Sequence, residues 1–262
     1  MKKRTISILA AVMAAALLWG CAPQQDTVET TVSIIHRETT APTVPPETTL
    51  PTTQPEETSE AFRAALKTIH DELIFPGLPD SAKIELWEPG TIEDEQFAIL
   101  DVDGDGAEEL LVSVSNTYMA GMCEVIYGYD AKSDSVRVEA QVFPGVTYYP
   151  GMKQVPSSHN QGHAGDVLWP YSVMTYDPTE DSYKLTYYVD AWSREISETD
   201  YEGNPYPEDI DTDRDGYVYL ITENDQQSIL NRADFEAWEA ELFAGKEPLN
   251  VPWQKLTAEN IG

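Results

Sequence analysis

The segment FAILDVDGDGAEELLV, residues 97–112, constrains the fold more than any other stretch of the chain. One apolar run enters it, a second apolar run leaves it, and acidic residues alternate with other residues between them. Hard oxygen ligands at this spacing are typical of calcium loops. The sequence therefore predicts a calcium site in a loop between two strands. Its candidate ligands, at loop positions 1, 3, 5, 7 and 9, are Asp101, Asp103, Asp105, the carbonyl of Ala107 and Glu109.

The loop differs from an EF-hand in two respects. Position 12, where an EF-hand carries a bidentate glutamate, is Val112, and the residues before Asp101 have the pattern of a strand. Gly104 and Gly106 can adopt the positive φ angles that bring several carboxylates together. The alternative is that the Asp-Gly repeat merely turns the chain between two strands. A simple turn does not need four alternating acids, which favours the calcium site.

A second loop, DTDRDG, repeats the first half of this pattern. Position 9 is Tyr219, which has no carboxylate, and Arg214 places a positive charge where the first loop has glycine. We predict a weaker calcium site, to which Asp209 would add an oxygen; the alternative is an acidic turn into a strand over 217–221. The candidate ligands are Asp211, Asp213, Asp215 and the carbonyl of Tyr217.

The sequence DVDGDGAEEL resembles the D-x-D-G-D-G-x-x-E-L loop of FG-GAP and VCBS-type extracellular calcium-binding modules and of lipid-anchored proteins of Gram-positive bacteria. In the lipoproteins the resemblance extends through SHNQGHAG, WPYSVMTYDPTEDSYK, YVDAW, DTDRDGYVY and FEAW...VPWQKLT. It implies a calcium-binding fold and an extracellular location, and no particular activity. A seven-bladed propeller of the FG-GAP kind would need similar blades throughout, and the chain is too short for that architecture.

The N-terminal sequence MKKRTISILAAVMAAALLWGC combines basic residues, a short apolar run and a cysteine. This pattern predicts a secretion signal over residues 1–20. The cysteine follows Gly20 and so resembles a lipobox, which implies that Cys21 is lipidated and anchors the protein in the bilayer, on the extracellular face of the cell membrane. Trp19 departs from the usual lipobox pattern. A plain secretory signal or an uncleaved anchor is the alternative, although the apolar run is short for a spanning helix.

The formal net charge of the chain is -30, and loss of Lys2, Lys3 and Arg4 with the signal would make it -33. So acidic a surface repels nucleic acid, which we exclude as a partner. Once Cys21 is lipidated, Cys123 is the one remaining cysteine, so no intramolecular disulfide can form. Cys123 lies in an apolar strand pattern, which favours a buried residue over a nucleophile. Stability must then come from the core and from bound metal.

Residues 21–58 are rich in threonine and proline and nearly lack aromatic residues. Such a segment cannot bury enough apolar surface to fold, so we predict a disordered stalk. Residues 59–262 are long enough for one core. Apolar residues recur at helical spacing over 62–73, after Thr58 or Ser59 as the cap, and over 235–243, after Asn231 and Asp234 in a capping box. Gly245 should end the second helix.

The residues between the two helices have strand patterns. We predict a short strand over 83–87, two hairpins over 123–142 and 171–189, and an extended segment over 249–256. The hairpins share the frame Y-D-x-x-x-D-S, which indicates a faint internal repeat. Helices at both ends with antiparallel strands between them predict an α+β domain in which a β-loop-β unit holds calcium.

Other candidate residues carry weaker patterns. His159 and His163 stand four apart, but in a loop composition and without a completing cysteine or glutamate, although Asp166 is near. Ser157 and Ser158 could pair with that histidine and aspartate as a hydrolase triad, but no nucleophile-elbow glycines surround them. Aromatic residues cluster in the central third of the chain, where we expect most in the core and one or two along a glycan-binding groove. They are Tyr148, Tyr149, Trp169, Tyr171, Trp192 and Tyr206.

Together these patterns predict a lipid-anchored extracellular protein with a stalk and one calcium-stabilised α+β domain. We expect the domain to be a binding or structural module with a glycan or surface-protein ligand. The alternative is a secreted hydrolase that acts on cell-wall or other polymers, and a deep pocket with an acid pair would favour it.

Overall fold

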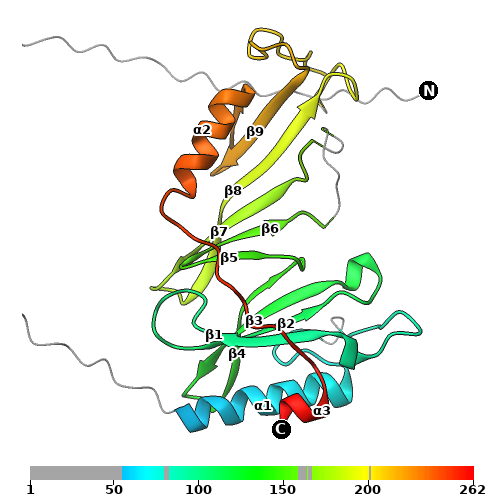
Figure 1. Ribbon diagram of the computed structural model, residues 1–262, viewed down its shortest axis with the longest axis vertical. Coiled ribbons are helices and arrows are strands. Elements are labelled where there is room, and N and C mark those ends of the chain that lie inside the picture. Colours follow the sequence, from blue (N-terminus) through cyan, green and yellow to red (C-terminus); the bar gives the residue numbers. More distant parts are fainter. Residues whose placement is uncertain (1–54, 80–82, 159–163, 165–166, 201) are drawn as a thin grey trace, which may run out of the picture. The chain divides into compact units, whose positions relative to one another are not determined.

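The computed structural model describes residues 55–79, 83–158, 164, 167–200 and 202–262. It confirms an α+β fold, in which two antiparallel sheets are accompanied by helices near both ends of the described region (Figure 1). The predicted signal peptide, Cys21 and nearly all of the predicted stalk lie outside the described residues. So do His159, His163 and Asp166. Among the described helices, none is both long enough and apolar enough to cross a membrane.

The first sheet has the strand order β11-β1-β2-β3-β4, with bounds Gln254–Lys255, Gln96–Leu100, Glu109–Val114, Cys123–Asp130 and Ser135–Val142. The second has the order β10-β9-β8-β7-β6-β5, with bounds Gln226–Leu230, Tyr217–Glu223, Ser182–Ser193, Tyr171–Asp177, Met152–Pro156 and Thr147–Tyr149. The α-helices are α1 (Pro55–Glu72), α2 (Arg232–Leu242) and α3 (Ala258–Ile261), and two short 3₁₀ turns cover Ile92–Asp94 and Met119–Gly121.

Helix α1 packs on one face of the first sheet. The predicted helical stripe is confirmed, because Phe62, Leu66 and Ile69 are buried against the alternate residues of β2 and β3. The predicted caps were wrong: the helix begins at Pro55, so Thr58 and Ser59 lie inside it. Proline is tolerated in the first turn, where its missing N–H would have no helical acceptor.

Helix α2 packs on one face of the second sheet. Its predicted cap is confirmed, because the Asn231 side chain accepts a hydrogen bond from the Asp234 N–H over 2.9 Å. Phe235 then stacks on Tyr219 of β9 with ring centroids 4.3 Å apart. The helix ends at Leu242, close to the predicted stop at Gly245, whose φ is +69°.

The predicted strand over 83–87 was wrong. Only Leu86 forms a bridge, to Thr117. The other backbone hydrogen bonds of this segment go one at a time to different partners, from Ile84 to the carbonyl of Leu73 and from Trp87 to that of Asn116. Exposed and less exposed residues alternate over 83–87, as in a strand, but no described strand pairs with this segment through a ladder of hydrogen bonds.

The two hairpins that share a sequence frame also share their structure. In both hairpins, the pairing register of the strands shifts by one residue at the same distance from the turn. In the first hairpin, the extra residue is Glu139 of β4. In both, the tyrosine before the turn donates its hydroxyl to the aspartate that ends it, from Tyr129 to Asp134 over 2.9 Å and from Tyr176 to Asp181 over 2.8 Å. The predicted repeat therefore has the same turn and the same bulge in both sheets.

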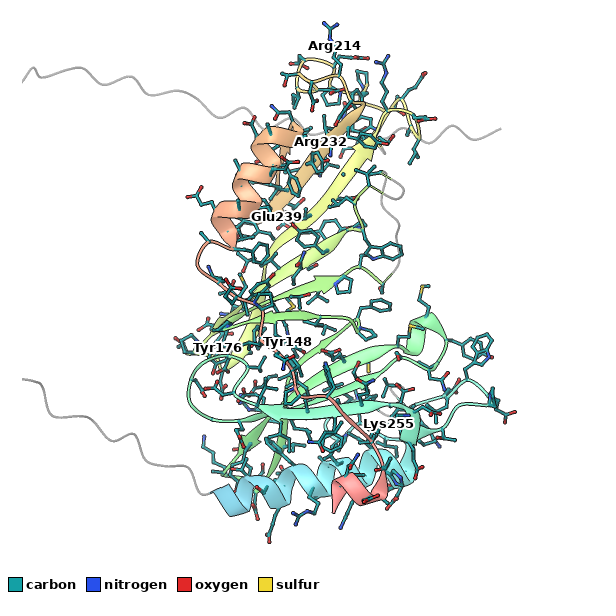
Figure 2. The ribbon with its side chains drawn as sticks, viewed as in Figure 1. Tyr148, Tyr176, Arg214, Arg232, Glu239 and Lys255 are labelled. Carbon is teal, nitrogen blue, oxygen red and sulfur yellow. The ribbon has the colours of Figure 1, made fainter. Side chains whose placement is uncertain are left out.

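The two sheets share a third hydrophobic cluster. It combines residues of the first sheet, such as Leu111 and Ile126, with Tyr148 and Tyr183 of the second. The predicted extended segment near the C-terminus contributes Leu249, Val251 and Trp253 to the same cluster. This segment runs past both sheets, since the Leu249 N–H donates to the Tyr148 carbonyl and β11 pairs with β1 (Figures 1 and 2). The β1–β2 loop lies at this junction.

Candidate metal centre

The first acidic loop closes the hairpin of β1 and β2, whose last pair before the loop is Leu100 with Glu109. The strand predicted before Asp101 is therefore confirmed, as is the β-loop-β arrangement. Gly104 and Gly106 both have positive φ, at +85° and +95°. These angles let the Gly104 and Gly106 N–H groups both donate to the Asp101 carboxylate, over 2.7 and 3.1 Å.

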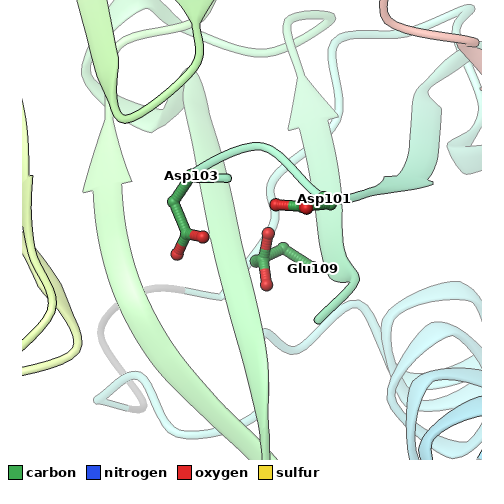
Figure 3. A group of neighbouring side chains, drawn as sticks. All are labelled: Asp101, Asp103 and Glu109. Atoms are coloured by element: carbon green, nitrogen blue, oxygen red, sulfur yellow. The ribbon is translucent and has the colours of Figure 1, made fainter. Parts of the chain in front are cut away.

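Three of the predicted ligands converge. Asp101, Asp103 and Glu109 each offer an oxygen within 4.8 Å of the others, and Figure 3 shows their carboxylates directed toward a shared space. Calcium binds oxygen at about 2.3–2.6 Å, so oxygens on opposite sides of one ion stand about 5 Å apart. The spacing of the three carboxylates fits one calcium ion.

Two of the three carboxylates, those of Asp103 and Glu109, are buried. Glu109 is 2% exposed, and its Oε2 accepts a hydrogen bond from the Val102 N–H over 2.9 Å. Asp103 is 7% exposed, and its buried Oδ2 has no hydrogen-bond partner among the described residues. Burial raises the pKa of Glu109 to about 9 and that of Asp103 to about 6, and the charges of neighbouring acids add to both shifts. A bound divalent ion would satisfy the unpaired oxygen and favour the ionised carboxylates.

The other two predicted ligands lie beside this group. The Asp105 carboxylate accepts the Ala107 N–H over 2.7 Å and is not one of the three converging side chains. Its second oxygen faces the Tyr176 hydroxyl at 3.5 Å, across the junction of the sheets. The Asp105 and Ala107 contacts thus shape the loop in the structure, and their role as ligands stays a prediction.

The second acidic loop has the same backbone pattern. Its Gly216 N–H donates to Asp211 Oδ2 over 3.1 Å, as Gly106 does to Asp101. The carboxylates of Asp211, Asp213 and Asp215 again lie within 4.8 Å of one another. Asp211 is 5% exposed, and its Oδ1 has no hydrogen-bond partner among the described residues.

Two features weaken the second loop as a metal site. Arg232, the first residue of α2, donates its Nε to Asp215 Oδ2 over 2.6 Å and so already neutralises one ligand. Tyr219, at position 9, is buried in the core beside α2. Tyr217, the predicted carbonyl ligand, donates its N–H to Asp215 Oδ1 over 2.9 Å, as Ala107 does to Asp105 in the first loop, so this contact does not distinguish the two loops. The Arg232 contact and the buried tyrosine at position 9 favour the first loop, and the ranking of the two loops stays a prediction.

Sequence reasoning missed two acids near the first loop. Glu139, the bulge residue of β4, and Asp181, in the β7–β8 turn, each lie within 4.8 Å of Asp103, measured between carboxylate oxygens. Glu139 lies in a strand and shows no ligand spacing. Its one sequence signal was Gly128 in the partner strand, because a glycine inside a strand often marks a bulge or a close approach.

A groove of about 740 Å³ lies over β8, β9 and β10, on the face of the second sheet opposite α2. This volume is in the usual range for small-molecule sites. Tyr188 and Trp192 give it aromatic surface, and Asn204 and Gln227 give it amides. Its charged lining residues are all acidic, namely Asp190, Asp200 and Glu202.

Most of the clustered aromatic residues are buried, as predicted. Trp169 is exposed, Trp192 lines the groove while mostly buried, and the other four lie in the core. Cys123 is also buried, and burial raises the pKa of its thiol to about 12, so it stays protonated at neutral pH. The histidine and aspartate of the hydrolase hypothesis lie outside the described residues, so that hypothesis stays a prediction.

Comparison with known proteins gave no assignment: no protein-family model matches the chain, and no match was found among curated proteins or among solved structures.

Proposed function

We propose that this chain is an extracellular, lipid-anchored calcium-binding protein whose α+β domain serves as a binding or structural module on the cell surface. The convergence of Asp101, Asp103 and Glu109 carries the proposal. These side chains would hold the ion, with Asp105 and the Ala107 carbonyl as further oxygen donors. Calcium would stabilise the domain by neutralising carboxylates that are buried where the two sheets meet.

The groove over β8, β9 and β10 supports a binding role. Aromatic surface beside amides and carboxylates suits a polyhydroxylated ligand such as a glycan, because rings cover apolar sugar faces while polar groups bind hydroxyls. All charged lining residues are acidic, which favours neutral or amine-bearing sugars over anionic ones.

Calorimetry of the full chain with calcium and with EDTA tests the proposal. Calcium at about 100 times its dissociation constant would add about 2.7 kcal/mol to the free energy of unfolding. For a domain of this size that raises the melting temperature by roughly 5–10 °C. Equal melting temperatures in calcium and in EDTA would contradict the stabilising role.

Neighbouring glutamates supply a matched pair of variants. Glu109→Gln removes a charge from the converging group, whereas Glu108→Gln removes one from an exposed position next to it. We expect Glu109→Gln to lose most of the calcium-dependent shift and Glu108→Gln to keep it. If both variants responded to calcium alike, Glu109 would not be a ligand.

A further inference from the structure

A second group of carboxylates lies beside the first loop and shares Asp103 with it. Asp103, Glu139 and Asp181 each offer an oxygen within 4.8 Å of the others. They come from the β1–β2 loop, the bulge of β4 and the β7–β8 turn. The first two belong to one sheet and the third to the other, so the group spans the junction between the sheets.

Two of these side chains are buried with an unpaired oxygen. Glu139 is 8% exposed and Asp103 is 7% exposed. The buried Oε2 of Glu139 and Oδ2 of Asp103 have no hydrogen-bond partner within the part of the chain that the structure describes. Buried carboxylate oxygens without partners are costly, so each one calls for an explanation. The first ion would already satisfy Asp103 Oδ2, so Glu139 Oε2 is the oxygen that calls for a second cation.

Protein cations near the group do not balance its charge. Arg137 bridges Glu139 Oε1, over 3.0 Å, and Asp181, much as Arg232 pairs with Asp215 in the second loop. It offsets one of the three negative charges and leaves Glu139 Oε2 and Asp103 Oδ2 without a hydrogen bond from any described residue. The fully buried Lys153 lies with its Nζ 3.9 Å from the centre of the Tyr183 ring, and that Nζ has no hydrogen-bond partner among the described residues. The two groups share Asp103 and together hold five carboxylates, so Arg137 leaves four negative charges, which equal the charge of two divalent ions.

The fold makes room for the Glu139 carboxylate. A Cβ on Gly128, in the neighbouring strand, would lie 2.0 Å from Glu139 Oε1. The carboxylate therefore occupies the space that a side chain on β3 would fill. The Asp181 side chain is 47% exposed, so one of the three carboxylates is open to solvent.

We propose that Asp103, Glu139 and Asp181 bind a second calcium ion, adjacent to the first, which fastens the two sheets to each other. All donors are oxygen atoms of carboxylates, as a hard cation requires. The inference rests on the proposed calcium-binding function and extends it to a site that joins two sheets.

Calcium binding to the full chain, counted by equilibrium dialysis, tests the inference. Glu139→Gln and Asp181→Asn should each bind one ion fewer than the unaltered chain. The matched control is Asp134→Asn, because Asp134 ends the equivalent turn of the β3–β4 hairpin and is hydrogen-bonded to Tyr129 as Asp181 is to Tyr176. The control should bind the same number of ions as the unaltered chain.

The outcomes separate this inference from the function on which it rests. If Glu139→Gln and Asp181→Asn bind as many ions as the unaltered chain while Glu109→Gln loses one, the second ion is refuted and the first stands. If the unaltered chain binds no calcium, both fail. Asp181 is half-exposed, so Asp181→Asn decides the question if circular dichroism shows that Glu139→Gln is misfolded.

Discussion

Single residues account for the difference between the two acidic loops. At the third position after the leading aspartate, the first loop has Gly104 with φ +85°, and the second has Arg214 with φ +58°. An L-residue in the left-handed region carries a cost of about 1–2 kcal/mol that glycine does not have. Arg214 also places a positive charge on a loop whose neighbouring carboxylates would bind a cation.

Arg214→Gly should therefore stabilise the protein and strengthen calcium binding at the second loop. Relief of the backbone strain favours the folded state, and the greater freedom of glycine in the unfolded chain offsets part of it, so we expect a net gain of about 0.5–1 kcal/mol in EDTA. Chemical denaturation measures this gain, and dialysis measures the binding. Arg214→Lys keeps the positive charge and still places a side chain at this positive φ angle, so it should behave like the unaltered chain. An equal gain in stability in that variant would refute the explanation.

Elements were predictable from sequence wherever local chemistry alone defines them. The stripe of α1, the cap of α2 and the turns of both hairpins depend on residues three to five positions apart, and the structure confirms them. The segment over 83–87 was mispredicted because a strand requires a partner, and only one bridge is available to it. The C-terminal α3 was missed because a single turn has no periodicity; it packs its Ile261 beside α1.

The cap of α2 gives a prediction at this scale. Asn231→Ala removes the acceptor for the Asp234 N–H and should lower the free energy of unfolding by about 1 kcal/mol. Asn231→Asp retains a side-chain oxygen at the same place and should preserve most of the stability. Urea denaturation of both variants measures the difference, and equal losses would show that the hydrogen bond to Asp234 is not what stabilises the helix.

At the scale of the whole molecule, the junction of the sheets contains more buried acid than base. Glu109, Glu124, Glu139 and Asp103 are buried in the first sheet and its loop, and Lys153 is the fully buried base in the described part of the chain. Glu124 accepts a hydrogen bond from Tyr148 of the second sheet, and Glu139 and Asp103 lie near Asp181. Burial raises the pKa of Glu139 to about 8 and lowers that of Lys153 to about 7. Without a metal ion, the folded protein therefore holds protons on Glu109, whose pKa burial raises to about 9, and on Glu139 near neutral pH.

This charge distribution predicts opposite pH dependence with and without calcium. In EDTA, Glu109 and Glu139 have folded pKa values of about 9 and about 8, against 4.5 for an ordinary glutamate. The stability that they contribute is therefore fully present below pH 4.5 and is lost as the pH rises toward their folded pKa values. Above the folded pKa of Lys153, about 7, deprotonation of this lysine makes the stability rise with pH instead. The melting temperatures should therefore be compared at or below about pH 7.

We therefore expect the melting temperature in EDTA to be lower at about pH 7 than at about pH 5, since ionised buried glutamates destabilise the fold. Saturating calcium should remove or reverse this trend, because the ion binds the ionised form. The double variant Glu109→Gln and Glu139→Gln should show a flatter profile in EDTA. A melting temperature that rose with pH in EDTA would contradict the buried-acid explanation.

The sequence by itself determined the local parts: the β-loop-β unit, the convergence of Asp101, Asp103 and Glu109, the helix stripes and the repeated turns. Each follows from side chains close together in the chain, where spacing sets geometry directly. Only the tertiary structure decided that the strands divide into two sheets, that Tyr148 and the C-terminal segment connect them, and that Glu139 and Asp181 meet Asp103. These contacts join residues far apart in sequence, so they depend on which faces of the sheets pack together. The spacing of residues along the chain does not predict that packing.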